Sequence, residues 1–185
     1  MKKVLLLAGW MMSIKLYEQY TDLGILFGEL DQEGFEADYV IGFSLGAIVA
    51  LRDIKKIKGK IILVNPPLPK KNFFVWFVRW IRYIRYEGLF LERQKFTINP
   101  FKYIWELLKC IKLLGIDFSD TLENIPKDKI TVLRGKGDRF FCDDEAVEFL
   151  RSKGIHVVEF DGGHNLSEKM EEAINLEVLP PSAHN

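Results

Sequence analysis

A serine between two glycines stands where one apolar run ends and a second apolar stretch begins. Residues 42–46 read Gly-Phe-Ser-Leu-Gly and have the form G-x-S-x-G. The run before them, at 39–43, is typical of a buried strand, and we expect residues 45–55 to form a helix. In this context the serine side chain is held above the end of the strand, and the glycines let strand and helix approach. Ser44 is therefore a candidate nucleophile.

An aspartate and a histidine follow two later apolar runs. Asp138 comes shortly after the run at 130–133, and His164 comes shortly after the run at 157–160. The carboxyl ends of parallel strands meet at one edge of a sheet, where such sheets gather their functional side chains. We expect His164 to take the Ser44 proton as general base, and Asp138 to orient the imidazole and stabilise its charged form.

Other polar residues fit these roles less well. Asp161 opens the turn before His164 and is a fallback for the acid. His156 lies at a strand start, where a structural role is expected, and His184 lies in the tail. The acids at 143–145 are typical of a helix N-terminus and lack metal-ligand spacing. The sequence therefore predicts neither a metal site nor a cofactor.

Acyl transfer at a serine also needs hydrogen-bond donors for the oxyanion that forms. The backbone amide of Leu45 is one expected donor, because this residue follows the nucleophile and opens the helix. The second donor is expected in the turn after the first apolar run, where the sequence places Gly9 and Trp10. We predict that the amide of Trp10 supplies it.

The elements that must position these residues are short and alternate in type. Five apolar runs predict strands, at 4–8, 39–43, 61–64, 130–133 and 157–160. Such runs are typical of strands buried on both faces of a parallel sheet. Helical patterns follow the second, fourth and fifth runs, at 45–55, 143–153 and 167–176. The pattern predicts one α/β domain over the 185 residues, with a mostly parallel sheet of five or six strands.

About sixty-five residues separate the third predicted strand from the fourth, more than a simple crossover needs. We expect the surplus, at about 68–114, to be a helical insertion that forms a lid. Twelve of the 24 aromatic residues fall between Phe73 and Trp105. In a helix at 73–86 one apolar face would cover the site and line an acyl pocket, and it comprises Phe73, Phe77, Trp80 and Ile84.

The insertion is also basic. Residues 70–112 hold ten Lys or Arg against three Glu, although the whole chain has no net charge. Arg79, Arg82 and Arg85 recur at three-residue steps, opposite the predicted apolar face. We expect this stripe to contact an acidic acyl carrier protein or an anionic membrane surface, or else to be a solvated surface. The neutral total charge gives no indication of nucleic-acid binding.

Two features bear on the compartment. Cys110 and Cys142 are far apart and belong to no CxxC pair, which favours reduced thiols in a cytoplasmic protein. No window reaches the roughly 20 apolar residues that a transmembrane helix needs.

Over nearly its whole length the chain resembles the α/β-hydrolase superfamily. The matching segments read LLLAGW at 5–10, GFSLG at 42–46, GKGD at 135–138 and GGH at 162–164. The order Ser, Asp, His is also that of the superfamily. The Gly-Trp turn, short length and helical insertion resemble the esterases of biotin synthesis, which demethylate pimeloyl-acyl-carrier-protein methyl ester. The chain departs from the pattern at Ala8, where most relatives carry His, and at Met11, where many carry Gly.

Together, the residues and the resemblance predict a serine carboxylesterase that forms an acyl-enzyme, with pimeloyl-acyl-carrier-protein methyl ester as a candidate substrate. An acyl thioesterase stays open, because a thioester passes through the same acyl-enzyme. The sequence is also compatible with a lipase-like hydrolase at a membrane surface and with an inactive hydrolase-like binding module.

Overall fold

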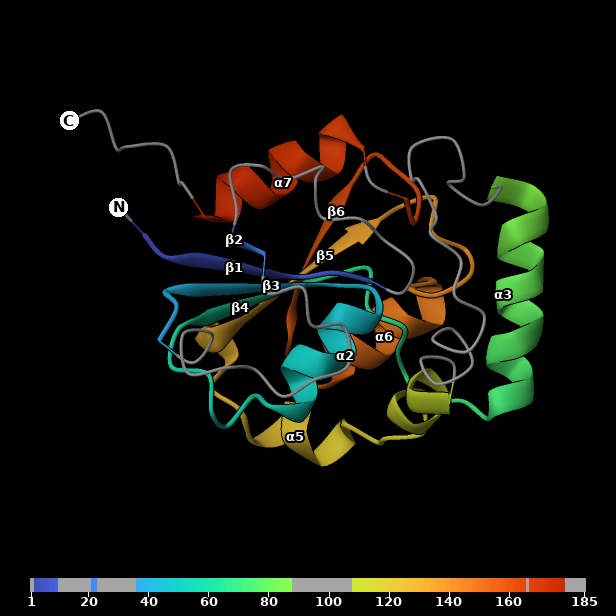
Figure 1. Cartoon of the computed structure of the whole chain (residues 1–185), viewed down its shortest axis with the longest axis horizontal. Coiled ribbons are helices and arrows are strands. Elements are labelled where there is room, and N and C mark those ends of the chain that lie inside the picture. The colour runs from blue at the N-terminus through green and yellow to red at the C-terminus, as the bar shows by residue number, and fades with distance from the viewer. Residues whose placement is uncertain (1, 10–20, 23–35, 88–107, 166, 179–185) are drawn as a thin grey trace.

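A computed structural model describes residues 2–9, 21–22, 36–87, 108–165 and 167–178 (Figure 1). All five predicted strands are present, as β1 (Val4–Leu7), β3 (Tyr39–Phe43), β4 (Lys60–Val64), β5 (Ile130–Gly135) and β6 (His156–Phe160). A sixth strand, β2 (Thr21–Asp22), has only two residues and was not predicted, because it forms no apolar run.

The six strands form one sheet in the order β2-β1-β3-β4-β5-β6, and every neighbouring pair is parallel. The prediction of a parallel sheet of five or six strands is therefore confirmed. The register also aligns the carboxyl ends, because Phe43 pairs with Val64 and Gly135 pairs with Phe160. The loops that follow β3, β4, β5 and β6 consequently leave the sheet at one edge.

Helices cover both faces of this sheet. Figure 1 shows α2 (Leu45–Arg52), α5 (Ser119–Asn124) and α6 (Asp144–Ser152) on one face, and α7 (Glu168–Val178) on the other. The 3₁₀ turn η2 (Lys127–Lys129) leads into β5. Three predicted helices are thus present within a few residues of their expected bounds. As predicted from the acids at 143–145, α6 begins with acidic residues, and the Asp143 side chain accepts a hydrogen bond from the Ala146 amide.

Two buried clusters explain why the strands are apolar at nearly every position. On β1, Leu5 and Leu7 face the cluster under α2, whereas Leu6 faces the cluster under α7. The same alternation runs through β4, where Ile61 and Leu63 belong to the first cluster and Ile62 and Val64 to the second. Because successive side chains point to opposite faces, a strand with both faces covered needs apolar residues throughout.

The long connection after β4 contains α3 (Phe73–Glu87), which stands beyond the carboxyl ends of the strands in Figure 1. This is the helix predicted at 73–86. Residues 108–114 of the predicted insertion are also helical, and residues 88–107 lie outside the described part of the chain. None of the described helices has the length and apolar character needed to cross a membrane.

Candidate active site

Ser44 lies in a tight turn between β3 and α2. Its backbone has φ 51° and ψ −116°, in the positive-φ region that residues other than glycine rarely adopt. The two neighbouring glycines make this turn possible. A Cβ on Gly42 would lie 2.6 Å from the Ala47 Cα, and a Cβ on Gly46 would overlap the Leu7 carbonyl oxygen. The G-x-S-x-G pattern is therefore a steric requirement of the turn.

The structure brings together the three residues predicted from the sequence. Nε2 of His164 lies 3.1 Å from Oγ of Ser44, and Nδ1 of His164 lies 2.7 Å from Oδ2 of Asp138. The three residues follow β3, β6 and β5, so the aligned carboxyl ends of these strands place them side by side. The chain of contacts is that of a serine whose proton can pass to a histidine held by a carboxylate.

Asp138 is fully buried and saturated with hydrogen bonds. Its Oδ1 accepts from the amides of Phe140 (3.1 Å) and Phe141 (3.0 Å), and its Oδ2 accepts from the amide of Cys142 (3.1 Å). Burial alone would raise the pKa of this carboxyl, but His164 and the hydrogen bonds from the Phe141 and Phe140 amides outweigh burial and lower it. An ionised Asp138 accepts a hydrogen bond from Nδ1–H of His164, which leaves Nε2 as the acceptor for the Ser44 hydroxyl.

Asp161 and His156, the less favoured candidates for acid and base, lie elsewhere. Asp161 is exposed, and the acid in contact with His164 is Asp138. His156 is exposed at the start of β6, where it pairs with Thr131, so it lies at the amino end of the sheet. The described residues contain no group of three or more His, Cys, Asp or Glu side chains that could hold a metal ion.

Aromatic side chains enclose the imidazole. The ring centroids of Phe141, Phe43 and Tyr83 lie 4.4, 5.5 and 5.6 Å from that of His164. Of these, Tyr83 comes from α3 and Phe141 from the loop that also holds Asp138. These three rings limit the access of water to the histidine, and the electrostatic contacts within the site are stronger as a result.

A polar link ties α3 to the residue beside the histidine. The Tyr83 hydroxyl donates to Oδ1 of Asn165, and Nδ2 of Asn165 donates to Oε2 of Glu87 at 3.1 Å. Burial, followed by the charges of Glu87 and Asp138, raises the pKa of Tyr83 to about 12, so the hydroxyl stays a donor at neutral pH. Burial also raises the pKa of the Glu87 carboxyl.

The predicted faces of α3 are wrong in part. Arg79 was expected in an outward basic stripe, but its guanidinium lies 2.7 Å from the Asp143 carboxylate and donates to the Phe140 carbonyl at 3.2 Å. Arg82 and Arg85 are exposed, as expected. The side chains that face the protein are instead Trp76, Arg79, Tyr83 and Glu87, which recur at three- and four-residue steps.

The apolar residues expected over the site lie further out. Phe73 and Phe77 are exposed, and Trp80 and Ile84 are half-buried. The reason is that the protein surface below α3 is partly polar. It presents the acidic start of α6 and the amide of Asn165, which bind Arg79, Tyr83 and Glu87.

The predicted oxyanion donor Leu45 lies within the described residues. Leu45 is the first residue of α2, so its amide has no acceptor within the helix and lies next to Ser44. Trp10, the other predicted donor, lies outside the described residues.

Asn65 is a buried residue of the site that was not predicted from the sequence. Its Nδ2 donates to the carbonyls of Gly163 (3.0 Å) and His164 (3.2 Å), and its Oδ1 accepts from the Gly135 amide at 2.8 Å. Its backbone is also in the positive-φ region, at φ 46°. Asn65 thus joins the ends of β4 and β5 to the histidine loop. Its position directly after a predicted strand, like that of Ser44, is the sequence signal that could have identified it.

We expect Asn65→Asp to lower kcat/KM for an ester about 10²-fold, mainly through kcat, by displacing His164. Aspartate tolerates the positive φ and keeps the oxygen that accepts from Gly135, but turns a second oxygen toward two carbonyls. A pH profile of kcat/KM and a thermal melt separate this positioning role from simple unfolding. Unchanged kcat/KM and an unchanged profile in the folded variant would contradict the role.

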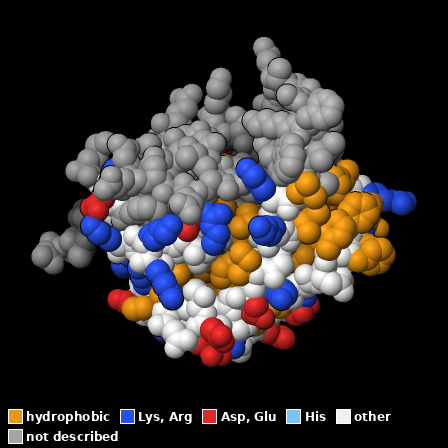
Figure 2. Space-filling view, turned by 60° about the horizontal axis from the view of Figure 1, so that its bottom comes forward, with side chains coloured by type: hydrophobic (Ala, Val, Ile, Leu, Met, Phe, Trp, Pro, Cys, Tyr) orange, Lys and Arg blue, Asp and Glu red, His pale blue; other side chains and the backbone are white. Residues whose placement is uncertain are grey.

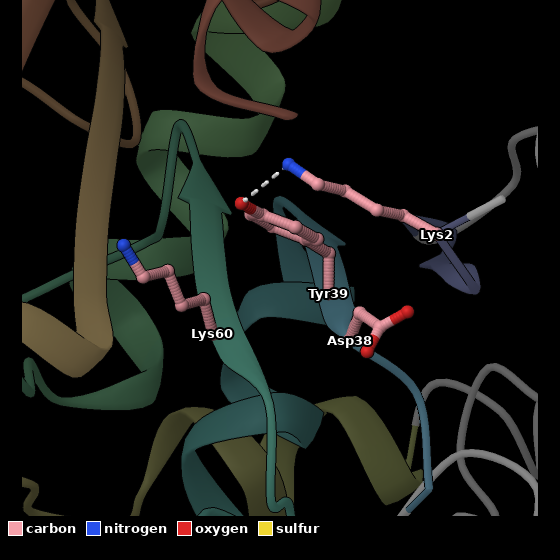
Figure 3. Close-up of a pocket in the computed structure, with 4 residues that line it drawn as sticks. All are labelled: Lys2, Asp38, Tyr39 and Lys60. Carbon is pink, nitrogen blue, oxygen red and sulfur yellow. Dashed lines mark hydrogen bonds between the residues drawn. The ribbon is translucent and has the colours of Figure 1, made fainter. Parts of the chain in front are cut away.

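A shallow pocket lies at the opposite end of the sheet (Figure 3). It is lined by Lys2, Asp38, Tyr39 and Lys60, and Nζ of Lys2 lies 3.4 Å from the Tyr39 hydroxyl. Tyr39 opens β3 and Lys60 opens β4, whereas Ser44 follows the end of β3. This pocket is therefore separate from the candidate active site.

No protein-family model matches the sequence, and no curated protein is a significant match. Among solved structures, the chain is similar to an α/β hydrolase enzyme from a Medee basin deep-sea metagenome library, at 14% identity and a TM-score of 0.64, over 95% of this chain and 87% of that one. It is also similar to an N-formylmaleamic acid deformylase from Pseudomonas putida S16, at 15% identity and a TM-score of 0.54, over 96% of this chain and 91% of that one. The chain spans 62% of the length of a thermophilic esterase from Thermogutta terrifontis, at 18% identity over 76% of this chain and a TM-score of 0.46. The first two likenesses agree with the parallel sheet described above, and the chain has the α/β-hydrolase fold.

Proposed function

We propose that this protein is a serine carboxylesterase that hydrolyses acyl esters through an acyl-enzyme. The observation that carries the proposal is the hydrogen-bonded chain from Asp138 through His164 to Ser44, with Ser44 in the strained turn before α2. Nucleophile, base and orienting acid within hydrogen-bond reach of one another are what nucleophilic acyl transfer requires.

In the first half-reaction Oγ of Ser44 attacks the ester carbonyl carbon while Nε2 of His164 takes the hydroxyl proton. The carbonyl oxygen becomes an oxyanion, to which the Leu45 amide donates as the first helical N–H beside the nucleophile. The tetrahedral intermediate then collapses. Its bond to the alcohol oxygen breaks, and the imidazolium returns the proton to that oxygen.

In the second half-reaction water attacks the acyl-serine carbonyl and gives its proton to Nε2 of His164. Collapse of the second intermediate breaks the bond to Oγ, which recovers the proton, and the carboxylic acid leaves. Throughout both steps Asp138 stays ionised, because burial raises its pKa less than His164 and the amides of Phe141 and Phe140 lower it. Its charge stabilises the imidazolium in each intermediate.

The acyl group and the alcohol of the substrate are proposed from the resemblance of the sequence and from the charges on α3. The methyl ester of a pimeloyl-acyl carrier protein is a candidate substrate through the resemblance of the sequence alone. A carrier protein docked on the basic stripe would meet only two outward arginines of α3, Arg82 and Arg85, because Arg79 is turned inward. A thioesterase would use the same three residues. An inactive binding module is disfavoured by the intact contacts among Ser44, His164 and Asp138.

The test is kcat/KM for a medium-chain dicarboxylate monomethyl ester, free and on acyl carrier protein, with the matching thioester as comparison. We expect measurable hydrolysis of the free ester, since the three residues act on the ester carbonyl itself. A large preference for the carried ester, lost at high salt, would assign the carrier-bound substrate. Hydrolysis of thioesters alone would replace the carboxylesterase proposal with the thioesterase, and no hydrolysis of any acyl substrate would contradict both.

A further inference from the structure

The outer face of α3 carries a continuous group of exposed apolar side chains. Phe73, Phe74, Phe77 and Ile81 have exposed fractions of 47%, 71%, 41% and 46%. Positions 73, 77 and 81 follow one another at four-residue steps and position 74 lies beside them, so the four share one side of the helix. Figure 2 shows hydrophobic side chains gathered at the edge of the molecule where α3 lies in Figure 1. We call these four residues the aromatic face.

The contacts on the inner side of α3 hold the aromatic face outward. Trp76 is buried and stacks on Phe141, with ring centroids 6.4 Å apart. Arg79 pairs with Asp143, and Tyr83 bonds Asn165. Turning α3 to hide the aromatic face would break all these contacts and leave partly buried polar groups unpaired. Exposure of the aromatic face is therefore built into the way that the helix is anchored.

The charges next to the aromatic face are basic. Arg82 and Arg85 are exposed on α3 and lie beside the aromatic face around the helix. The single acidic residue of α3 is Glu87, which is turned to the inner side and accepts a hydrogen bond from Asn165. The outer side of the helix thus joins large apolar side chains to cations.

We infer that the aromatic face, with Arg82 and Arg85, binds an anionic lipid surface. A helix lying in a bilayer interface buries an apolar side among the acyl chains, while Arg side chains reach anionic headgroups. An acidic carrier protein would pair with the arginines but would leave four large apolar side chains without a role, so lipid fits the face better. The consequence of this binding rests on the proposed function: acyl esters in the bilayer would then reach the active site, where Tyr83 of α3 packs against His164.

The test is flotation of the full chain with vesicles of phosphatidylcholine, alone or mixed with phosphatidylglycerol. We expect binding to the mixed vesicles that weakens with salt. Arg82→Glu with Arg85→Glu is expected to weaken it about 30-fold or more, because each basic residue near such a surface contributes about 1 kcal/mol. Phe74→Ser with Phe77→Ser is expected to weaken binding to a similar extent by removing buried apolar area.

Matched controls lie on other surfaces. Lys55→Glu with Lys60→Glu reverses two exposed charges elsewhere, and Leu176→Ser removes an exposed apolar side chain of α7. Both should bind as the unchanged chain does, and circular dichroism checks that every variant folds. Absence of binding by the folded protein, or equal binding by α3 and control variants, would overturn the inference. Binding of acyl carrier protein instead of vesicles would also overturn it and assign the face to a protein partner.

Failure of the inference is distinguishable from failure of the proposed function. Flotation needs no reaction at Ser44, and reaction of Ser44 with a soluble fluorophosphonate needs no lipid. Labelling of Ser44 without vesicle binding would reject the lipid-binding inference and support the esterase proposal. Vesicle binding by a protein whose Ser44 does not react would support the lipid-binding inference and reject the esterase proposal.

Discussion

Replacing Ser44 with alanine is expected to lower kcat for an ester substrate by about 10⁶-fold while the protein stays folded. The variant loses the only atom that forms the acyl-enzyme, and His164 loses the hydroxyl 3.1 Å from its Nε2. The fold is retained because the backbone amide of Ser44 still donates to the Val64 carbonyl at 2.8 Å and the glycines beside it are unchanged. Steady-state kinetics measure the loss of kcat, and a thermal melt shows whether the fold is retained.

Ser152→Ala is the matched control, because Ser152 is exposed at the end of α6 and its hydroxyl bonds only the Phe149 carbonyl among the described contacts. It should retain full activity. Turnover by the Ser44 variant at a rate close to that of the unchanged protein would mean that another group is the nucleophile.

Asp138→Asn is expected to lower kcat by about 10⁴-fold. An amide in place of Oδ2 presents N–H groups to Nδ1 of His164 and to the Cys142 amide, both of which bond that oxygen now. The histidine then carries its proton on Nε2, the wrong tautomer for accepting the Ser44 proton. Kinetics over a pH series, with substrate saturating, measure the loss.

The matched control is Asp161→Asn, since Asp161 precedes the same histidine by three residues and is exposed. Its kcat should be unchanged. Equal losses in the two variants would show that the loop as a whole, rather than the contact between Asp138 and His164, governs the reaction.

Asp138 also links activity to stability in acid. Its pKa is lower in the folded state than in the unfolded state. Its contribution to the free energy of unfolding is therefore present above the unfolded pKa of about 3.9 and is lost as the pH falls through the lower folded pKa. Asp138→Asn has no titratable carboxyl at this position, so its free energy of unfolding lacks this contribution to the acid destabilisation.

The fold could be predicted from the sequence because its strands are buried on both faces. Apolar runs such as 39–43 are then nearly uninterrupted and easy to recognise, and β3 has those bounds in the structure. The two-residue β2 carries no such signal, because Thr21 and Asp22 are both polar. The residues Ser44, Asp138 and His164 could be proposed since each follows a run that ends at the same edge of a parallel sheet.

The orientation of α3 could not be predicted from periodicity. Its sequence places large apolar residues on more than one side, so helical spacing defines several faces without saying which one is covered. Residues that are distant in the sequence determine which face of α3 is covered. Asp143 and Glu145 bind Arg79, and Asn165 binds Tyr83, from more than sixty positions further along the chain. A pattern confined to residues 73–86 contains none of these partners.

Asn65 illustrates the same limit at a single residue. An asparagine after a strand is common in turns, where it tolerates positive φ. Its second role depends on carbonyls of Gly163 and His164, which the chain reaches only after two more strands. The sequence indicates the turn, and only the assembled sheet shows the support of the histidine loop.

The most direct test of the central claim is reaction of the folded protein with a fluorophosphonate, followed by mass spectrometry of the intact chain and its peptides. The reagent bonds covalently to a serine that a neighbouring base has activated. We predict a single adduct, located on Ser44, that is absent from Ser44→Ala and strongly slowed in Asp138→Asn. A folded protein that forms no adduct, or that forms it on another residue, would contradict the assignment of Ser44 as the nucleophile.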